Sequence, residues 1–124
     1  MIKPILLYAG AALTALWGIA HLFPTKSIVK GFGKLSADNR NILTMEWITE
    51  GIFLIFLGVL VAAVTFFGIG STVALIVYML TVMVLMVMAI LSLFTGFQVN
   101  FIPFKLCPFI FALSAILIFI GRLL

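Results

Sequence analysis

Four long hydrophobic segments constrain the fold of this chain more than any other feature. A helix that crosses a bilayer needs about 20 mainly apolar residues, and four segments of the 124-residue chain reach about that length. They cover residues 4–23, 42–67, 72–94 and 101–123. Because lipid offers no hydrogen-bond partner to the backbone, we expect each segment to be helical. The sequence therefore predicts an all-α integral membrane four-helix bundle, built as a single transmembrane domain over residues 1–124.

The composition supports a membrane protein and excludes several other classes. Hydrophobic residues make up 66% of the chain and charged residues only 8%, whereas a soluble domain carries about 25% charged residues. The single cysteine, Cys107, excludes an internal disulfide. The first segment has some features of a secretory signal peptide, but three more apolar segments follow it, so we expect it to remain as a helix.

The connection over residues 24–41 is the main polar stretch, and we expect an amphiphilic loop there. Gly31 and Gly33 argue against one regular helix through it. Its apolar side chains are expected to dip from the headgroups toward the membrane; they are Ile28, Val29, Phe32 and Leu35. Ser36 or Asp38 is a suitable N-cap for the helix that follows.

Basic residues are distributed unevenly between the two sides of the predicted bundle. Four spans place both termini on one side and the first and third loops on the other. The residues of those loops and adjoining helix ends that carry positive charge are Lys26, Lys30, Lys34, Arg40 and Lys105, while the termini hold only Lys3 and Arg122. Positive residues favour the cytoplasmic side. We therefore predict a multi-pass protein of the cell membrane, with the first and third loops in the cytoplasm and both termini outside.

Two acidic residues lie within the second predicted span. Glu46 and Glu50 are spaced i, i+4, so they share a helix face. At 1.5 Å per residue they lie roughly 6 Å and roughly 12 Å in from Ile42. A charge at the centre of a membrane helix costs about 2.5–3.5 kcal/mol on insertion scales. We therefore expect protonation of one carboxylate, or pairing with His21 or Lys105, to offset this cost.

Polar residues of the other spans gather at the same end of the bundle. His21 is near the loop end of the first helix, and Ser92 and Lys105 occupy matching positions on the third and fourth helices. The predicted ligand or proton site consists of His21, Glu46 and Glu50. Its predicted lining residues are Trp17, Phe53, Tyr78, Ser92 and Lys105. One histidine and two glutamates can bind a metal, but no His-Glu-x-x-His spacing is present, so we predict no metal site.

Each of these residues also has a purely structural interpretation. Protonated or paired glutamates can hold helices together, and His21 can be an interfacial histidine. Trp17 and Trp47 are most simply aromatic residues of the interfacial belt. The chain has no Ser/His/Asp pattern, P-loop or Gly-x-Gly-x-x-Gly motif. Whether it is an enzyme therefore stays open, and no catalytic residue or cofactor is assigned.

Small residues in the first helix give a separate indication about packing. Gly10 and Gly18 recur on a helix that also carries Ala11 and Ala15. Small side chains allow membrane helices to approach closely. We therefore predict that this helix packs tightly against a neighbour.

Two stretches resemble the DoxX-like family of small four-helix membrane proteins. They are "WGIAHLFP" (17–24) and "WITEGIFLIFLG" (47–58), and "NFIPFKLCPFIFALSAILIFIG" (100–121) is similar to the family's closing helix. The family pattern would fall on Gly18, His21, Pro24, Glu50, Gly51 and Gly58. Glu46 and the long loop over 25–40 depart from it. The resemblance implies a four-helix membrane fold and a link to sulfur-compound oxidation coupled to quinone.

Three hypotheses for function follow. In the first, the chain binds an amphiphilic, isoprenoid or quinone-like ligand in a polar intramembrane pocket, as a redox-accessory subunit. In the second, it is a proton-coupled small-molecule transporter that uses Glu46 and Glu50. In the third, it is a structural membrane subunit. The expected partners are membrane lipids, a hydrophobic small molecule, and a second copy or another subunit. Because the basic residues form no aromatic-laced surface, nucleic acid is not expected.

Overall fold

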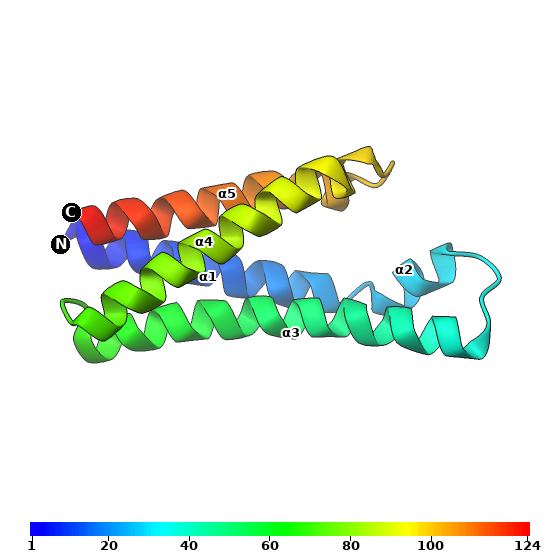
Figure 1. Ribbon diagram of the computed structural model, residues 1–124, viewed down its shortest axis with the longest axis horizontal. Helices are drawn as coiled ribbons and strands as arrows, with labels where there is room; N and C mark the ends of the chain where they lie inside the picture. The colour runs from blue at the N-terminus through cyan, green and yellow to red at the C-terminus, as the bar shows by residue number, and fades with distance from the viewer.

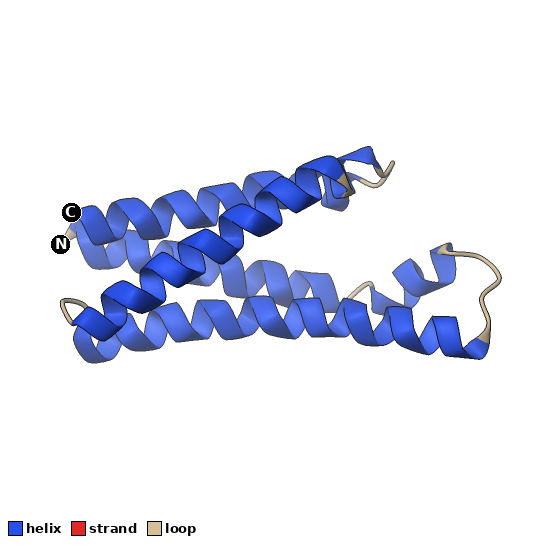
Figure 2. Cartoon of the chain, in the orientation of Figure 1, coloured by secondary structure: helices blue, strands red, loops and turns tan.

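The computed structural model describes residues 1–124 and consists of helices joined by short connections (Figures 1 and 2). Its elements are α1 (Ile2–Leu22), α2 (Thr25–Gly31), α3 (Ala37–Gly68), α4 (Thr72–Phe94), the 3₁₀ helix η1 (Gly96–Gln98) and α5 (Ile102–Leu123). The helices α1, α3, α4 and α5 are each long and apolar enough to cross a membrane. The predicted all-α membrane four-helix bundle is confirmed. The chain is a small multi-pass integral membrane protein.

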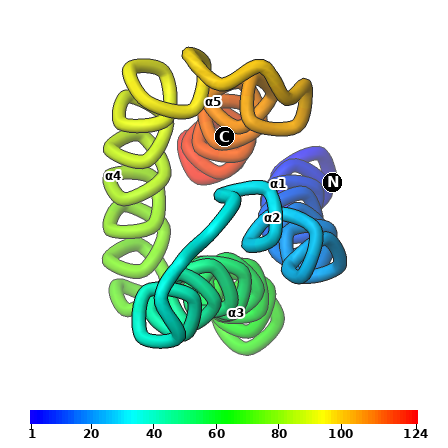
Figure 3. The backbone as a smooth tube through the Cα atoms, turned by 90° about the vertical axis from the view of Figure 1, so that its right-hand side faces the viewer, coloured from blue at the N-terminus to red at the C-terminus, as the bar shows by residue number.

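The four long helices run alternately up and down. Both termini and the α3–α4 turn lie at one end of the bundle, and α2 and η1 lie at the other (Figure 1). Viewed along the bundle, α1 lies between α3 and α5, and α4 packs beside α5 (Figure 3). The α3 and α4 helices are close near their connecting turn and diverge toward the α2 end (Figure 1). This divergence makes the α2 end the open end of the bundle.

Apolar side chains fill the bundle and also cover its outside. The largest fully buried side chains include Tyr78, Leu7, Leu54, Leu85 and Ile118. Large hydrophobic residues are also exposed along every long helix. In a helix of a membrane protein such residues face lipid. The outer surface of the bundle is therefore in contact with membrane lipids.

The helix α3 is longer than a bilayer requires. The structure begins it at Ala37, ahead of the predicted Ile42, because the Ser36 hydroxyl accepts a hydrogen bond from the Asn39 N–H at 3.1 Å. Its 32 residues span about 48 Å at 1.5 Å per residue, against about 30 Å of hydrocarbon. The polar first turns of α3, which carry Asp38 and Arg40, therefore project beyond the hydrocarbon.

The connection expected as an amphiphilic loop contains the short helix α2. Its residue Val29 is buried, and α2 packs against α3. The helix ends at Gly31, and Gly33 follows with φ of +82°, the only positive φ in the chain. Glycine adopts this conformation without the steric cost of a Cβ atom. The two glycines therefore separate α2 from α3 instead of allowing one continuous helix.

The helices α1 and α3 pack through glycines, as predicted for the first helix. A Cβ atom added at Gly18 would lie 2.7 Å from the Gly51 carbonyl oxygen, and one at Gly58 would lie 2.5 Å from the Ala11 carbonyl oxygen. These distances are too short for a carbon–oxygen contact, and the atoms met belong to backbone. The absence of side chains at these positions therefore allows the two backbones to touch, which is a common means of helix association in membranes.

We predict that Gly18→Ala lowers the stability of the bundle. The added methyl group forces the α1 and α3 backbones apart, and overpacking of this kind typically costs about 1–3 kcal/mol. Gly31→Ala is the matched control, because a Cβ atom there meets nothing within 4 Å. The measurement is the thermal unfolding of both variants in mild detergent. A melting temperature equally reduced in both would contradict the packing argument.

Candidate functional site

The open end of the bundle brings a histidine and a glutamate together. His21 lies in the last turn of α1, and Glu50 lies beside Gly51 of the glycine contact on α3. The Nε2 atom of His21 is 3.5 Å from Oε2 of Glu50. This is the single ion pair of the structure. The side chain of His21 is only 7% exposed and that of Glu50 is 41% exposed, so the carboxylate forms the accessible side of the pair.

Trp47 holds the His21 ring from a second direction. The two rings stack with centroids 3.8 Å apart and an interplanar angle of 16°. The indole Nε1 of Trp47 also donates a hydrogen bond to the His21 carbonyl oxygen at 2.7 Å. The Phe104 ring then meets Trp47 edge-on, with centroids 5.5 Å apart. The imidazole is thereby fixed in orientation by α3 and α5 side chains as well as by its own helix.

Trp47 is not among the predicted site residues. The sequence predicts that it belongs to the interfacial aromatic belt. The signal that indicates otherwise is its spacing: Trp47 precedes Glu50 by three residues, so the two side chains are neighbours on one helix surface. A tryptophan next to a carboxylate on the same face of an apolar helix is a candidate for the same site.

Two buried nitrogen atoms at this end have no hydrogen-bond partner. They are Nε2 of His21, which approaches Glu50 without hydrogen-bond geometry, and Nε1 of Trp17. A buried polar group that lacks a partner costs about 1–3 kcal/mol. A polar group of a bound molecule would remove this cost at either atom. The site thus has unused hydrogen-bonding capacity within an otherwise apolar bundle.

Three adjoining cavities surround the His21–Glu50 pair, and together we name them the cleft. The acidic cavity, of about 430 Å³, is lined by residues that include Glu46, Glu50, Trp47, Phe53 and Met88. The central cavity, of about 360 Å³, shares Glu50 and Met88 with the acidic cavity and adds His21, Ser92, Phe104 and Cys107. The aromatic cavity, of about 350 Å³, shares His21, Phe104 and Cys107 with the central cavity and adds Trp17 and Trp47. Glu50 and His21 therefore stand at the two boundaries between neighbouring cavities.

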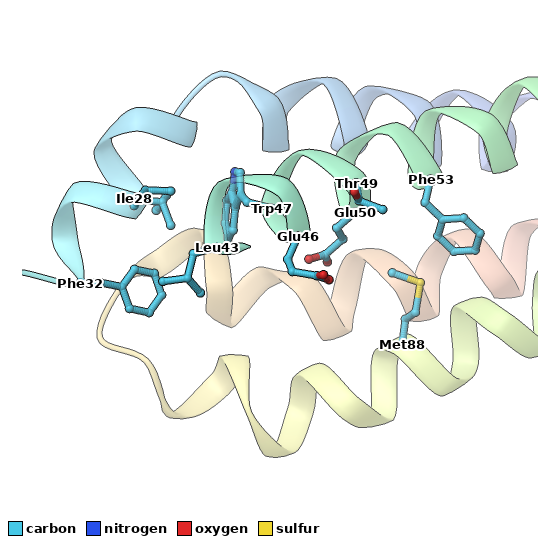
Figure 4. Close-up of a pocket in the computed structure, with 10 residues that line it drawn as sticks. Ile28, Phe32, Leu43, Glu46, Trp47, Thr49, Glu50, Phe53 and Met88 are labelled. Carbon is cyan, nitrogen blue, oxygen red and sulfur yellow. The ribbon is translucent and has the colours of Figure 1, made fainter. Parts of the chain in front are cut away.

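The acidic cavity has a marked charge character. Glu46 and Glu50 are in its wall, and no basic residue lines it. Figure 4 shows both carboxylates projecting from α3 on the side of the cavity where Met88 of α4 lies. Phe53, one turn farther along α3, is 38% exposed. The cavity therefore opens at the surface beside Phe53, and Ile28 and Val29 of α2, with Phe32 just after it, complete its wall.

The structure brings most of the predicted site residues to the cleft. Glu46, Glu50 and Phe53 line the acidic cavity, His21 and Ser92 line the central cavity, and Trp17 lines the aromatic cavity. Tertiary packing thus brings Trp17 of α1 and Ser92 of α4, which are far apart in the sequence, into adjoining cavities.

Two predicted lining residues lie elsewhere. Tyr78 is fully buried in the opposite half, where its hydroxyl and that of Thr65 are 2.8 Å apart. Lys105 lies outside the three cavities, with its Nζ atom 5.3 Å from the centroid of the Phe97 ring. Tyr78 therefore joins α3 to α4 near the turn, and Lys105 makes a cation–π contact instead of an ion pair with a glutamate.

Comparisons of the chain with protein-family models, with curated proteins and with solved structures find no match.

We predict that Trp47→Phe destabilises the protein more than Trp17→Phe does. Both substitutions keep an aromatic ring and remove an indole, but only Trp47 donates a hydrogen bond, to the His21 carbonyl. The loss of that bond should cost about 0.5–1.5 kcal/mol. The measurement is thermal unfolding of the two variants in the same detergent. Equal losses would show that the Trp47 hydrogen bond does not contribute to stability.

Proposed function

We propose that the chain binds a neutral amphiphile, of the quinone or isoprenoid-lipid class, with its polar head at the His21–Glu50 pair. The observation that carries this proposal is the buried His21 imidazole, whose Nε2 lacks a hydrogen-bond partner although it lies 3.5 Å from a carboxylate on a cavity wall. Ligand pockets commonly combine apolar walls with a few convergent polar groups. The cleft has this composition.

The polar groups of the cleft suit a ligand whose polar head both accepts and donates hydrogen bonds. His21 can donate from Nε2, and an ionised Glu50 can only accept. Ser92 donates its own proton to the Ala89 carbonyl at 3.1 Å, so its oxygen is left to accept. A hydroxyl or carbonyl head meets these requirements without adding a charge to the membrane interior. A quinone and its quinol supply both kinds of group.

The walls around these groups suit an apolar ring and chain. Phe53 and Met88 line the acidic cavity, and Phe104 and Phe111 line the central cavity. The exposure of Phe53 provides a lateral route from the bilayer. An amphiphile dissolved in the membrane can therefore enter between α3 and α4 without crossing water.

The resemblance to the DoxX-like family points in the same direction, and we propose that the chain belongs to that structural class. What supports this is the position of the pattern's residues. Gly18 meets Gly51, and His21 meets Glu50. In this proposal the protein is a redox-accessory subunit that presents a quinone to a partner. Catalysis by this chain forms no part of the proposal.

We expect Glu50→Gln to weaken ligand binding about tenfold or more. A hydrogen bond to a charged group is worth about 1.5–3 kcal/mol, and about 1.4 kcal/mol corresponds to a factor of ten. The measurement is quenching of tryptophan fluorescence by a short-chain benzoquinone, because Trp47 stacks on His21. Asp38→Asn is the matched control. It also removes one carboxylate from α3, at a position that lines none of the three cavities of the cleft.

Three outcomes of this experiment would contradict the proposal. Equal quinone affinity in Glu50→Gln and the wild type would exclude Glu50 as a head contact. Binding of a lipophilic cation such as tetraphenylphosphonium, lost in both Glu46→Gln and Glu50→Gln, would instead support the proton-coupled transporter. A large loss of thermal stability in Glu50→Gln, with no quinone bound by the wild type, would support a structural subunit.

We also propose that α2 and η1 face the cytoplasm and that both termini and the α3–α4 turn face outward. The support is the excess of positive charge at the α2 end. In a Cys107→Ser background, we expect a membrane-impermeant maleimide added to intact cells to label Gly70→Cys in the turn and not Ser36→Cys before α3. The reverse labelling pattern would invert the topology.

A further inference from the structure

A further cavity at the same end of the bundle has the opposite charge character to the acidic cavity of the cleft. It has a volume of about 350 Å³ and lies where α2 packs against the start of α3. Its wall consists of Thr25, Lys26, Val29, Lys30, Arg40 and Thr44. Three of these six residues are cations and none is acidic. Val29 also lines the acidic cavity, but none of the three cations lines any cavity of the cleft.

The cations of this cavity have no counterion within the protein. The single ion pair of the structure is the one between His21 and Glu50. Lys26 and Lys30 are spaced i, i+4 on α2, where like charges repel each other. Arg40 adds a third positive group from α3. An anion held between the two helices would relieve this repulsion.

The two threonine hydroxyl groups of the cavity already donate their protons within the protein, so they offer a ligand no hydrogen-bond donor. Thr25 donates its proton to the Leu22 carbonyl at 2.6 Å, and Thr44 donates to the Arg40 carbonyl at 2.7 Å. The remaining side-chain donors are the two ammonium groups and the guanidinium group. A guanidinium can bind two oxygens of a phosphate at once, and a lysine adds a point charge. The donor set therefore fits a phosphate group.

The place of the cavity in the fold indicates the source of that phosphate. Val29 on α2 is buried, while Lys26 and Lys30 on the same helix are exposed. The apolar side of α2 thus packs inward at the level where α3 leaves the hydrocarbon. This is the depth of lipid headgroups, and basic residues there interact with anionic lipids. We propose that Lys26, Lys30 and Arg40 form a binding site for the headgroup phosphate of an anionic phospholipid.

The test uses the full chain in detergent and native mass spectrometry with added phosphatidylglycerol or phosphatidylcholine. We expect wild-type protein to retain phosphatidylglycerol in preference to phosphatidylcholine. The double variant K26Q/R40Q should bind phosphatidylglycerol at least tenfold more weakly. The double variant K3Q/K34Q removes the same net charge from positions outside the cavity, and it should bind like the wild type. Equal weakening in both double variants, or in neither, would overturn the proposal.

Two further measurements keep the test decisive. Millimolar inorganic phosphate should not displace phosphatidylglycerol from the wild type, and displacement would assign the site to free phosphate instead of lipid. Arg40→Lys keeps the charge but removes the two-pronged guanidinium contact. It replaces K26Q/R40Q in the test if that double variant does not fold. We expect it to lower phosphatidylglycerol affinity severalfold while Lys34→Arg does not. Unchanged affinity in Arg40→Lys would contradict the role of Arg40.

Discussion

The close approach of α1 and α3 is the contact on which the rest of the open end depends. Gly18 and Gly51 allow the backbones to touch, and a Cβ atom at Gly18 would lie 2.7 Å from the Gly51 carbonyl oxygen. His21 follows Gly18 by three residues, and Glu50 is adjacent to Gly51. The ionisable pair is therefore positioned by the same contact that joins the helices. In lipid, where apolar surfaces gain little by meeting each other, such small-residue packing is a main source of helix association.

Some buried polar groups of the bundle pair within the protein, and others are left without a partner. Near the α3–α4 turn, Thr65 donates to the Val61 carbonyl or shares a hydrogen bond with Tyr78, so α3 and α4 are tied together by groups that pair within the protein. At the α2 end the helices diverge, and His21 and Trp17 keep nitrogen atoms without partners beside cavities. Buried polar groups are usually paired. The Ser114 Oγ and Arg122 Nε atoms of α5 also lack partners, so what distinguishes the α2 end is that its unpaired nitrogen atoms line cavities of the cleft together with Glu50.

Sequence reasoning reached the fold and much of the candidate site. Helical periodicity correctly placed Glu46, Glu50 and Phe53 on one wall, and the count of spans placed His21 and Ser92 at the same end. The same reasoning failed to locate Tyr78, because periodicity gives the face of a helix but not the partner that a side chain finds along it. The Tyr78 hydroxyl contacts that of Thr65 in the opposite half of the bundle, and the Lys105 ammonium contacts the Phe97 ring.

From the sequence alone it follows that the chain crosses a membrane with four helices and that Glu46 and Glu50 lie toward one end of the bundle. Those properties follow from segment length and from the cost of exposing backbone or charge to hydrocarbon, which each segment meets on its own. The packing of the helices against one another determines that Trp47 stacks on His21, that Glu50 and not Glu46 approaches the imidazole, and that Lys26, Lys30 and Arg40 line one cavity. These arrangements depend on how far apart separate helices lie and how their side chains fit, and no local pattern in a single segment specifies that distance.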